Sequence, residues 1–459
     1  MWIFFPAVAS AALFLLRRWY RVSVLVGTLL CLILAGLAWQ FPIEQTIRLG
    51  PWALRLADTF SLLGRQLTLS AADQPLLMLI YLIAAFWFGA SYIGQAGRLL
   101  VPLGLAMIVA LTAALAVKPF LYAALLIELA ALLAIPILTE PGNPVQRGVL
   151  RFLTFQTIGM PFLLFTGWLL EGSESGVGNP QMMLRAILLI VFGLAFILAI
   201  FPFHTWVPML AGQARPYPAA FVLTIVPLMV ILFGIGLLDQ YASLRNYPNL
   251  PELLQRLGLV VCLTSSIGMA FERNMGRILG YAILVETGFS LLALGLPGGA
   301  LLSISMILPR TLAVGVWALG LMALQAHHAD LKYYSLSGAA WGLPFASAAV
   351  LVAQFSIAGF PLLAGFPIRL ALWEGAAVQS IWVALGALIS VVGLFVSSLR
   401  TLAVLVKRIN GAHWTSAESL SAKIFLSIGI VAIILVGITP QWVLPVLAEV
   451  IQSFPKLVP

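Results

Sequence analysis

Seven ionisable side chains stand within or beside long apolar segments, where a charge is costly to bury and is therefore a sign of function. They are Glu128, Lys118, His204, Glu286, Arg310, Arg369 and Glu374. A carboxylate can carry a proton, an imidazole can relay one through either ring nitrogen, and a lysine or arginine can bias both by its charge. These residue types together predict a proton pathway through a membrane.

Glu128 is the only charged residue between Leu121 and Leu138. An ionised carboxylate in hydrocarbon costs about 3 kcal/mol or more, so Glu128 either holds a proton or pairs with a group on another helix. The simpler alternative is a polar contact that only fixes two helices together. Lys118, which directly precedes Pro119, is either the partner of Glu128 or a side chain that reaches the membrane surface.

Glu286 occupies a similar place in a later apolar segment. Arg310, which follows Pro309, is the basic residue deepest in that region and is the expected partner of Glu286. An arginine stays charged in proteins, so Arg310 would tune or gate a neighbouring group and would not itself release a proton.

His204 stands in the run FPFHTWVP at 201–208, where two prolines interrupt an apolar segment. The histidine either relays a proton or binds backbone carbonyls that Pro208 leaves unpaired. Arg369 and Glu374 belong to a second interrupted segment, in which prolines and glycines cluster at 359–367. These two residues either end the pathway or form a local ion pair.

The composition excludes a soluble globular domain, because 62% of the 459 residues are hydrophobic and only 8% are charged. The chain is therefore predicted to be an all-α polytopic membrane protein in contact with the lipid bilayer. The formal net charge of +9 is explained by membrane topology, and we expect no nucleic-acid partner. No nucleotide-binding, metal-binding or nucleophile motif is found, so no cofactor or metal is expected in this chain.

About 20 apolar residues span a bilayer, and on this basis the sequence contains about fourteen transmembrane helices. Their approximate limits are 2–17, 22–40, 75–95, 98–117, 119–138, 148–171, 183–211, 217–238, 251–271, 276–295, 299–325, 342–376, 378–406 and 421–450. The seventh and twelfth are broken by proline, and paired broken helices are typical of inverted-repeat transporters. We expect two inverted five-helix repeats, at about 98–238 and 251–406.

The lysines and arginines favour one orientation of these helices. Most of them fall in loops on one side if both termini lie outside, which is the arrangement that the positive-inside rule predicts. The only long loop is 41–72, in which the alternating residues 65–70 predict a short hairpin strand. We therefore divide the chain into two N-terminal helices with an outer loop (1–74), a core (75–406), and a C-terminal helix and tail (407–459).

Several motifs together resemble the antiporter-like membrane subunits of respiratory complex I and of Mrp-type cation/proton antiporters. They are FPFHTWVP at 201–208, Glu128, RILGYA at 277–282 and SIAGFPLLAGF at 356–366. The resemblance covers about residues 75–406 and implies fourteen helices, two inverted repeats and a hydrated line of ionisable residues at mid-membrane. It assigns Glu128 to the family's fifth-helix glutamate, Arg310 to a position where lysine is usual, and Arg369 to the charged position of the twelfth helix.

The chain also departs from the family pattern and is a divergent member. Ile197 stands where the seventh-helix lysine is usual, Met229 stands where an eighth-helix lysine or histidine is common, and Glu286 replaces a neutral residue or histidine. Loss of the usual lysine removes the charge that would drive proton binding and release at Glu128. The member has therefore either rerouted its pathway or stopped pumping.

The resemblance implies a proton-translocating subunit of a complex I-like NADH:quinone oxidoreductase or related redox-driven ion pump. Other membrane subunits would be its partners, and flavin, iron–sulfur clusters and quinone would lie in partner subunits. The alternatives are a degenerate structural subunit that does not pump, and an Mrp-type monovalent cation/proton antiporter subunit, with Na⁺ as the alternative to protons. The expected location is an energy-transducing membrane, either a prokaryotic inner or plasma membrane or a thylakoid-like membrane, with both termini outside.

Overall fold

Apolar segments of this chain fold as helices because a helix pairs every backbone N–H and C=O within its own segment, as hydrocarbon requires. The computed structural model describes residues 1–41, 43, 46–49, 52–55, 59–62, 64–139, 142, 144–174, 180–408 and 413–457. Ten helical segments among these residues are long and apolar enough to cross a membrane. Shorter apolar helices cover Leu100–Ala116, Gln181–Ile197 and Pro344–Ile357.

The helices of the first half, in chain order, are α1 Phe4–Leu15, α2 Tyr20–Gln40, α3 Gln74–Ala90, α4 Leu100–Ala116, α5 Ala123–Leu138, α6 Arg147–Glu174, α7 Pro180–Ile197, α8 Trp206–Gln213 and α9 Pro216–Gln240. Those of the second half are α10 Ala242–Arg245, α11 Leu250–Phe271, α12 Met275–Leu294, α13 Gly299–Ser305, α14 Ile307–Gln325, α15 Pro344–Ile357, α16 Phe366–Gln379, α17 Ile381–Leu405, α18 Leu420–Ile438 and α19 Pro440–Glu449.

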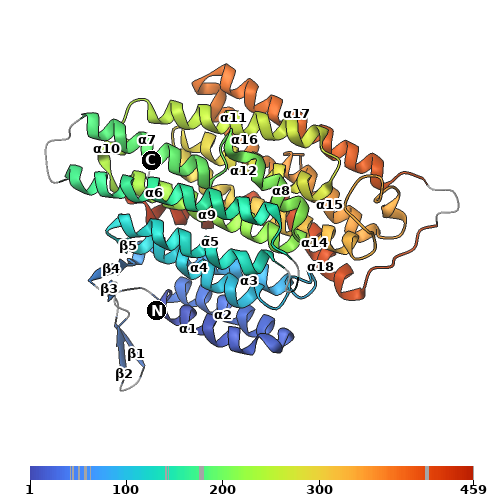
Figure 1. Cartoon of the computed structure of the whole chain (residues 1–459), viewed down its shortest axis with the longest axis horizontal. Coiled ribbons are helices and arrows are strands. Elements are labelled where there is room, and N and C mark those ends of the chain that lie inside the picture. The colour runs from blue at the N-terminus through green and yellow to red at the C-terminus, as the bar shows by residue number, and fades with distance from the viewer. Residues whose placement is uncertain are drawn as a thin grey trace.

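The helices lie side by side along the long axis of the molecule (Figure 1). The blue helices α1 and α2 form one edge, and α11 and α17 lie together at the opposite edge. The segments most completely enclosed by protein are α9, α12 and the pair α13 and α14. Polar groups on these central helices are therefore kept from lipid.

The predicted membrane-helical class is confirmed, and most predicted segments agree with the helices to within a few residues. Both predicted breaks are present, because 183–211 divides into α7 and α8 and 342–376 divides into α15 and α16. The segments 299–325 and 421–450 are also divided, each into a longer and a shorter helix. The count of fourteen spans and the inverted repeats stay predictions.

Short strands follow α2. Strand β1 (Thr46–Leu49) pairs with β2 (Trp52–Arg55), and β3 (Thr59–Leu62) pairs with β4 (Arg65–Thr68), both antiparallel. Strand β4 also pairs with β5 (Val117–Lys118), so the predicted hairpin strand is confirmed. The predicted loop 41–72 and tail 407–459 include residues 42, 44–45, 50–51, 56–58, 63, 409–412 and 458–459, which lie outside the described residues.

Both ends of the chain pack at the same end of the helices. Near the N-terminus, the indole Nε1 of Trp2 donates to the carbonyl oxygen of Leu34 in α2 (3.2 Å). Near the C-terminus, the hydroxyl of Ser453 donates to the carbonyl oxygen of Ala72, just before α3 (2.9 Å). The N–H of Lys456 donates to the carboxylate of Asp239 at the end of α9 (2.7 Å).

Helices α11 and α12 are brought together by glycines. A Cβ atom on Gly258 would lie 2.5 Å from the backbone nitrogen of Leu292 and 2.6 Å from the oxygen of Gly288. A Cβ on Gly288 would lie 2.7 Å from the sulfur of Cys262. Small residues of this kind allow the backbones of membrane helices to touch. They hold α12, which carries Glu286, in its place.

The substitution Gly258→Ala should destabilise the protein by about 1–3 kcal/mol, because the added methyl meets backbone atoms that cannot move independently. The midpoint of thermal unfolding of the purified protein measures this effect. Gly234→Ala is the matched control, since a Cβ there would find nothing within 4 Å. Equal midpoints for the two variants would contradict the packing argument.

Candidate ion-translocation site

The break between α15 and α16 is built by residues that no regular helix accommodates. Gly359 has φ +77° and Leu362 has φ +71°, so the chain reverses between the two helices. A Cβ on Gly365 would lie 2.1 Å from the carbonyl oxygen of Ser356, so only glycine fits at this crossing. The N–H of Gly365 is bound instead by the Ser356 hydroxyl oxygen at 3.3 Å.

Arg369 occupies the first turn of α16 and satisfies the groups exposed by the break. Its Nη2 donates to the carbonyl oxygen of Ile357, the last residue of α15, at 3.3 Å. The same nitrogen forms an ion pair with Oε1 of Glu286 on α12. The guanidinium carbon also lies 3.7 Å from the ring centre of Phe289, in a cation–π contact.

The ion pair is almost completely enclosed. The side chains of Arg369 and Glu286 are 4% and 6% exposed, although their residue numbers differ by 83. An enclosed ion pair is stable only while both partners are present and hydrogen-bonded, because removal of one leaves a charge without compensation. A change in the protonation of Glu286 would therefore alter the forces between α12 and α16.

Arg310 on α14 approaches the same place from another side. Its Nη2 donates to the hydroxyl oxygen of Thr287 at 3.0 Å, and the residue is 3% exposed. The expected direct pairing of Glu286 with Arg310 is thereby corrected, since Arg369 makes the ion pair. The alternative in which Arg369 pairs locally with Glu374 is also corrected, because Arg369 turns toward α12 and Glu374 is exposed.

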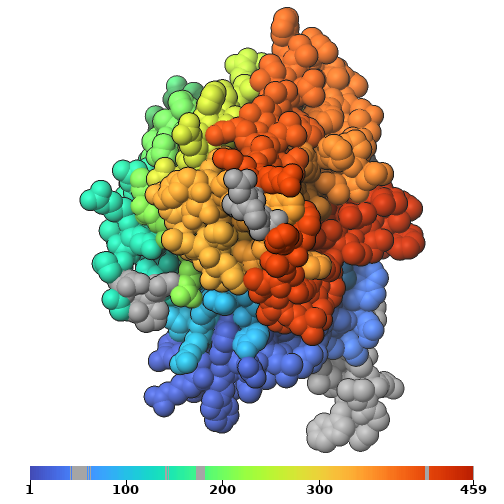
Figure 2. Space-filling model, turned by 90° about the vertical axis from the view of Figure 1, so that its right-hand side faces the viewer, coloured from blue at the N-terminus to red at the C-terminus, as the bar shows by residue number. Residues whose placement is uncertain are grey.

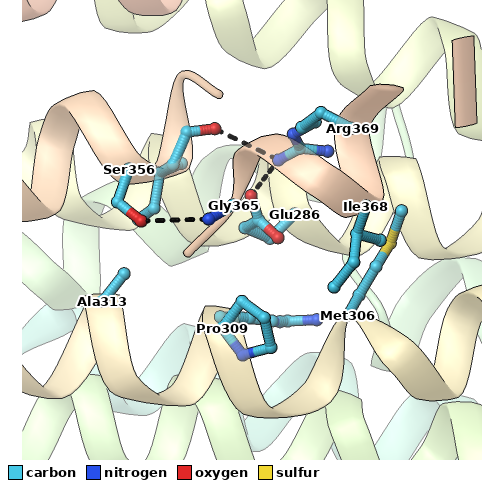
Figure 3. A pocket seen from close by; sticks show the side chains of 10 residues that line it. Glu286, Met306, Pro309, Ala313, Ser356, Gly365, Ile368 and Arg369 are labelled. Carbon is cyan, nitrogen blue, oxygen red and sulfur yellow. Dashed lines mark hydrogen bonds and ion pairs between the residues drawn. The ribbon is translucent and has the colours of Figure 1, made fainter. Parts of the chain in front are cut away.

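A small cavity joins these groups (Figure 3). It measures about 20 Å³, enough for a water molecule. Its lining is Glu286, Met306, Pro309, Arg310, Ala313, Ser356, Ile357, Gly365, Ile368 and Arg369. A water at this position would lie among the carboxylate and both arginines.

The cluster of Glu286, Arg310 and Arg369 contains more positive than negative charge. One carboxylate faces two guanidinium groups, which leaves an excess of one positive charge when Glu286 is ionised. Nε of Arg310 and Nη1 of Arg369 are buried and make no hydrogen bond to the part of the chain that is described. Neutralisation of Glu286 would double that excess, so a change of charge at this carboxylate alters the repulsion between the two guanidinium groups.

At the break in the first half, the end of the helix is bound by a neutral side chain. Helix α7 ends at Ile197, whose carbonyl oxygen accepts a hydrogen bond from the side-chain nitrogen of Gln156 at 3.2 Å. Ala199, with φ +55°, then turns the chain toward α8. An uncharged amide here occupies the capping role that Arg369 has in the second half. Ile197 and Met229 are both buried.

Glu128 lies between α5 and α6, near the outer face of the bundle. Its Oε1 accepts a hydrogen bond of 2.6 Å from the Thr157 hydroxyl. The neighbouring side chains Leu125 and Leu129 are exposed, so this part of α5 faces outward. The partner found for Glu128 is therefore a neutral hydroxyl group.

The remaining predicted site residues lie apart from the cluster, and none of them is among the described residues that line its cavity. Lys118 is exposed in β5 and lines a different cavity together with Asp73 and Asp239. His204 is half-buried at the α7 to α8 break, with its ring centre 5.5 Å from that of Phe201. The structure thus brings together Glu286, Arg310 and Arg369 from the predicted set.

Thr287, Phe289 and Gln156 take part in these contacts but were not predicted from the sequence. Phe289 follows Glu286 by three residues and so lies on the same face of α12. Helical spacing from Glu286 would have found it. Gln156 carries no comparable signal, because nothing along the chain relates it to Ile197.

Comparison with known proteins agrees with this architecture. The sequence model of the family described as NADH:quinone oxidoreductase/Mrp antiporter, transmembrane region, matches residues 165–397, just over half of the chain. NADH-quinone oxidoreductase subunit N of Ectopseudomonas mendocina (strain ymp) is 27% identical over 289 residues, which cover 59% of this chain and 58% of the relative. The match thus spans less than two thirds of that relative's length.

Two solved structures share the fold. A chain of the Mrp complex from Dietzia sp. DQ12-45-1b has a TM-score of 0.83 at 15% identity, covering 100% of this chain and 98% of that chain. A chain of respiratory complex I from Thermus thermophilus with bound aureothin has a TM-score of 0.75 at 21% identity, covering 98% and 100%.

Proposed function

Because the chain belongs to the NADH:quinone oxidoreductase/Mrp antiporter transmembrane family, we propose that it is a proton-translocating membrane subunit of a complex I-like, redox-driven ion pump. The observation that carries this proposal is the buried cluster of Glu286, Arg310 and Arg369 at the α15 to α16 break. Buried charges in a membrane protein are expensive, and a purely structural contact at this place could use neutral groups, as Gln156 does in the first half.

The cluster acts as a charge-sensitive switch in this proposal. While Glu286 is ionised, it holds Arg369 and thereby holds the start of α16 against α12. A proton on Glu286 removes the attraction and leaves two guanidinium groups facing each other, which favours separation of the helices. A charge movement in a neighbouring subunit would drive the same step in either direction.

The other predicted residues belong to the outer parts of the pathway. Glu128, Lys118 and His204 lie in the first half, and Glu374 lies at an exposed position of α16. We assign them to proton entry and exit, and we assign the switch itself to the second half. We place the switch in the second half because the chain departs from the family pattern at Ile197 and Met229. These substitutions leave the first half without the usual lysines.

The chain would work as part of a membrane assembly. Other membrane subunits would adjoin this chain, flavin, iron–sulfur clusters and quinone would be held by partner subunits, and the ion would be H⁺. The assembly would lie in a prokaryotic energy-transducing membrane, with both termini outside. Residues 75–406, with repeats at about 98–238 and 251–406, would form the translocating core.

A structural subunit that does not pump is the second candidate. The first half favours it, because Ile197 and Met229 are buried and apolar and the one partner of Glu128 among the described residues is a hydroxyl group. The buried charges of the second half favour a working pathway instead. The two candidates differ in whether Glu286 must be ionisable.

Purification of the tagged chain in mild detergent from its native membrane, followed by mass spectrometry of bound proteins, tests the assignment to a redox-driven assembly. We expect flavin-binding and iron–sulfur subunits to co-purify in fixed ratio with the chain. Recovery of the chain alone, or only with other antiporter-like subunits, would contradict a redox-driven assembly and favour a cation/proton exchanger.

A further inference from the structure

A basic recess opens at the end of the helices opposite the β strands. It measures about 780 Å³ and lies among the ends of α8, α11 and α17, the start of α12 and the loop that follows α14. Its charged and aromatic lining is Glu272, Arg273, Arg277, Lys332, Tyr333, Tyr334 and Arg400. Figure 2 faces this end, with the gold-orange loop after α14 near its centre.

The recess carries an excess of positive charge. Four cations line it, and Glu272 is the one carboxylate among its described lining residues. Glu272 accepts hydrogen bonds from the backbone N–H groups of Arg273 and Asn274, at 2.8 and 3.1 Å, and lies 3.6 Å from the Arg277 guanidinium. The Arg273 side chain is exposed and pairs with no described group.

Asp330, just outside the lining, compensates one further cation. Its carboxylate lies 3.6 Å from Nζ of Lys332. Hydrogen bonds from the Tyr334 hydroxyl and then from the Lys332 backbone N–H lower the pKa of Asp330, so it is ionised at neutral pH. Four cations against two carboxylates still leave an excess of two positive charges, which fits an anionic ligand.

The recess is preorganised by backbone contacts between its loops. The backbone N–H of Met275 donates to the carbonyl oxygen of Leu331 at 2.9 Å. The backbone N–H of Tyr333 donates to the carbonyl oxygen of Arg273, also at 2.9 Å. Arg400 on α17 donates to the carbonyl of Ala270 at the end of α11 and lies 5.5 Å from the ring centre of Tyr333. The backbone that carries the cations and the Arg400 side chain are thus held in place before any ligand arrives, which reduces the entropy cost of binding.

Apolar surface leads directly away from the recess along α11 and α17. These helices pack tightly, since a Cβ on Gly393 would lie 2.7 Å from the oxygen of Ser266. Beside this contact, Phe271 and Leu399 precede the charged residues of the recess and are 78% and 55% exposed. Further outward-facing apolar side chains along the two helices are Val260, Ile267, Ile389, Val392 and Val396. A ligand with both a charged end and long hydrocarbon chains matches this surface.

We propose that the basic recess binds the phosphate headgroup of an anionic phospholipid, whose acyl chains lie along α11 and α17. Arginine and lysine clusters at the ends of membrane helices attract anionic headgroups electrostatically, and aromatic rings such as those of Tyr333 and Tyr334 are common at the headgroup level. A free phosphate would satisfy the cations but would gain nothing from the exposed apolar side chains. The bound lipid would link α17 to the connection between α11 and α12. Helix α12, which begins at this connection, carries Glu286.

The test uses the full chain in mild detergent, titrated with phosphatidylglycerol and followed by native mass spectrometry. We expect phosphatidylglycerol to remain bound and zwitterionic phosphatidylcholine to bind far more weakly. The double substitution Arg273→Gln with Lys332→Gln should weaken phosphatidylglycerol binding roughly 25-fold, because each cation removed should weaken it about fivefold. Arg273→Lys keeps the charge and should retain the binding.

Arg17→Gln with Arg18→Gln is the matched control. These exposed residues lie at the same end of the bundle but at the opposite edge, in the blue turn between α1 and α2 (Figure 2). The control should bind phosphatidylglycerol like the unmodified protein, and all variants should keep the same unfolding midpoint. Equal binding of both phospholipids, an equal loss in the control, or displacement of the lipid by an equal concentration of inorganic phosphate would overturn the proposal.

Discussion

Substitution of Arg369 by methionine is expected to destabilise the protein by about 3–5 kcal/mol, because it leaves the carboxylate of Glu286 buried without its ion-pair partner. The carbonyl oxygen of Ile357 also loses its donor at the end of α15. Methionine is shorter than arginine but similar to it in volume and flexibility, so the cavity left behind is small. The unfolding midpoint of the purified protein would fall accordingly.

The double substitution Glu286→Gln with Arg369→Met should recover a large part of this loss. It removes both charges of the pair and leaves the cluster with one positive charge, that of Arg310, which equals the excess in the unmodified protein. A neutral pair of similar volume costs little in a buried site. The energy of interaction follows from the double-mutant cycle of the two single variants and the double variant. Additive effects would show that the two side chains do not stabilise each other.

The exposed pair of Arg256 and Glu252 provides the control for this cycle. It also joins an arginine to a glutamate, but its side chains are 72% and 60% exposed. Pairs in solvent contribute about 0–1 kcal/mol, so Arg256→Met should change the midpoint very little. A fall in the midpoint as large as that of Arg369→Met would show that loss of any arginine destabilises the protein, whether or not its ion pair is buried.

The breaks in the helices were predictable from sequence because proline and glycine have local consequences. Proline lacks a backbone N–H, and Gly359 adopts a positive φ that other residues rarely accept. Both features are visible in a short stretch of sequence. Membrane spans were predictable for a similar reason, since length and apolar composition are enough to define them.

The partner of Glu286 was not predictable in this way. Arg310 is closer to Glu286 along the chain, and sequence spacing favoured it over Arg369. The choice depends on the reversal at 358–365, which aims the first turn of α16 at α12. No sequence pattern predicts the direction in which the chain continues after such a reversal.

The position of Glu128 near the outer face was also hidden. Apart from Glu128, helix α5 is apolar on all sides, so its hydrophobic periodicity does not distinguish a lipid-facing side from a protein-facing side. Only the exposure of Leu125 and Leu129 reveals it. The hydroxyl partner Thr157, on the next helix, follows from how α5 and α6 pack.

Substitution of Glu286 by glutamine is expected to lower proton translocation while leaving electron transfer in place. Glutamine keeps the shape of the side chain and can still accept a hydrogen bond from Arg369, but it cannot take up or release a proton. The switch would then be fixed in one charge state. The redox centres, which we place in partner subunits, would be unaffected by a change in this chain.

The ratio of protons translocated to electrons transferred, measured in membrane vesicles that contain the intact assembly with Glu286→Gln, tests the central claim most directly. Glu252→Gln is the matched control, since it makes the same chemical change at an exposed position of α11. We predict a lower ratio for Glu286→Gln, at an electron-transfer rate sufficient to measure it, and an unchanged ratio for Glu252→Gln. An unchanged ratio for Glu286→Gln in a fully assembled complex would contradict the assignment of Glu286, Arg310 and Arg369 to proton translocation.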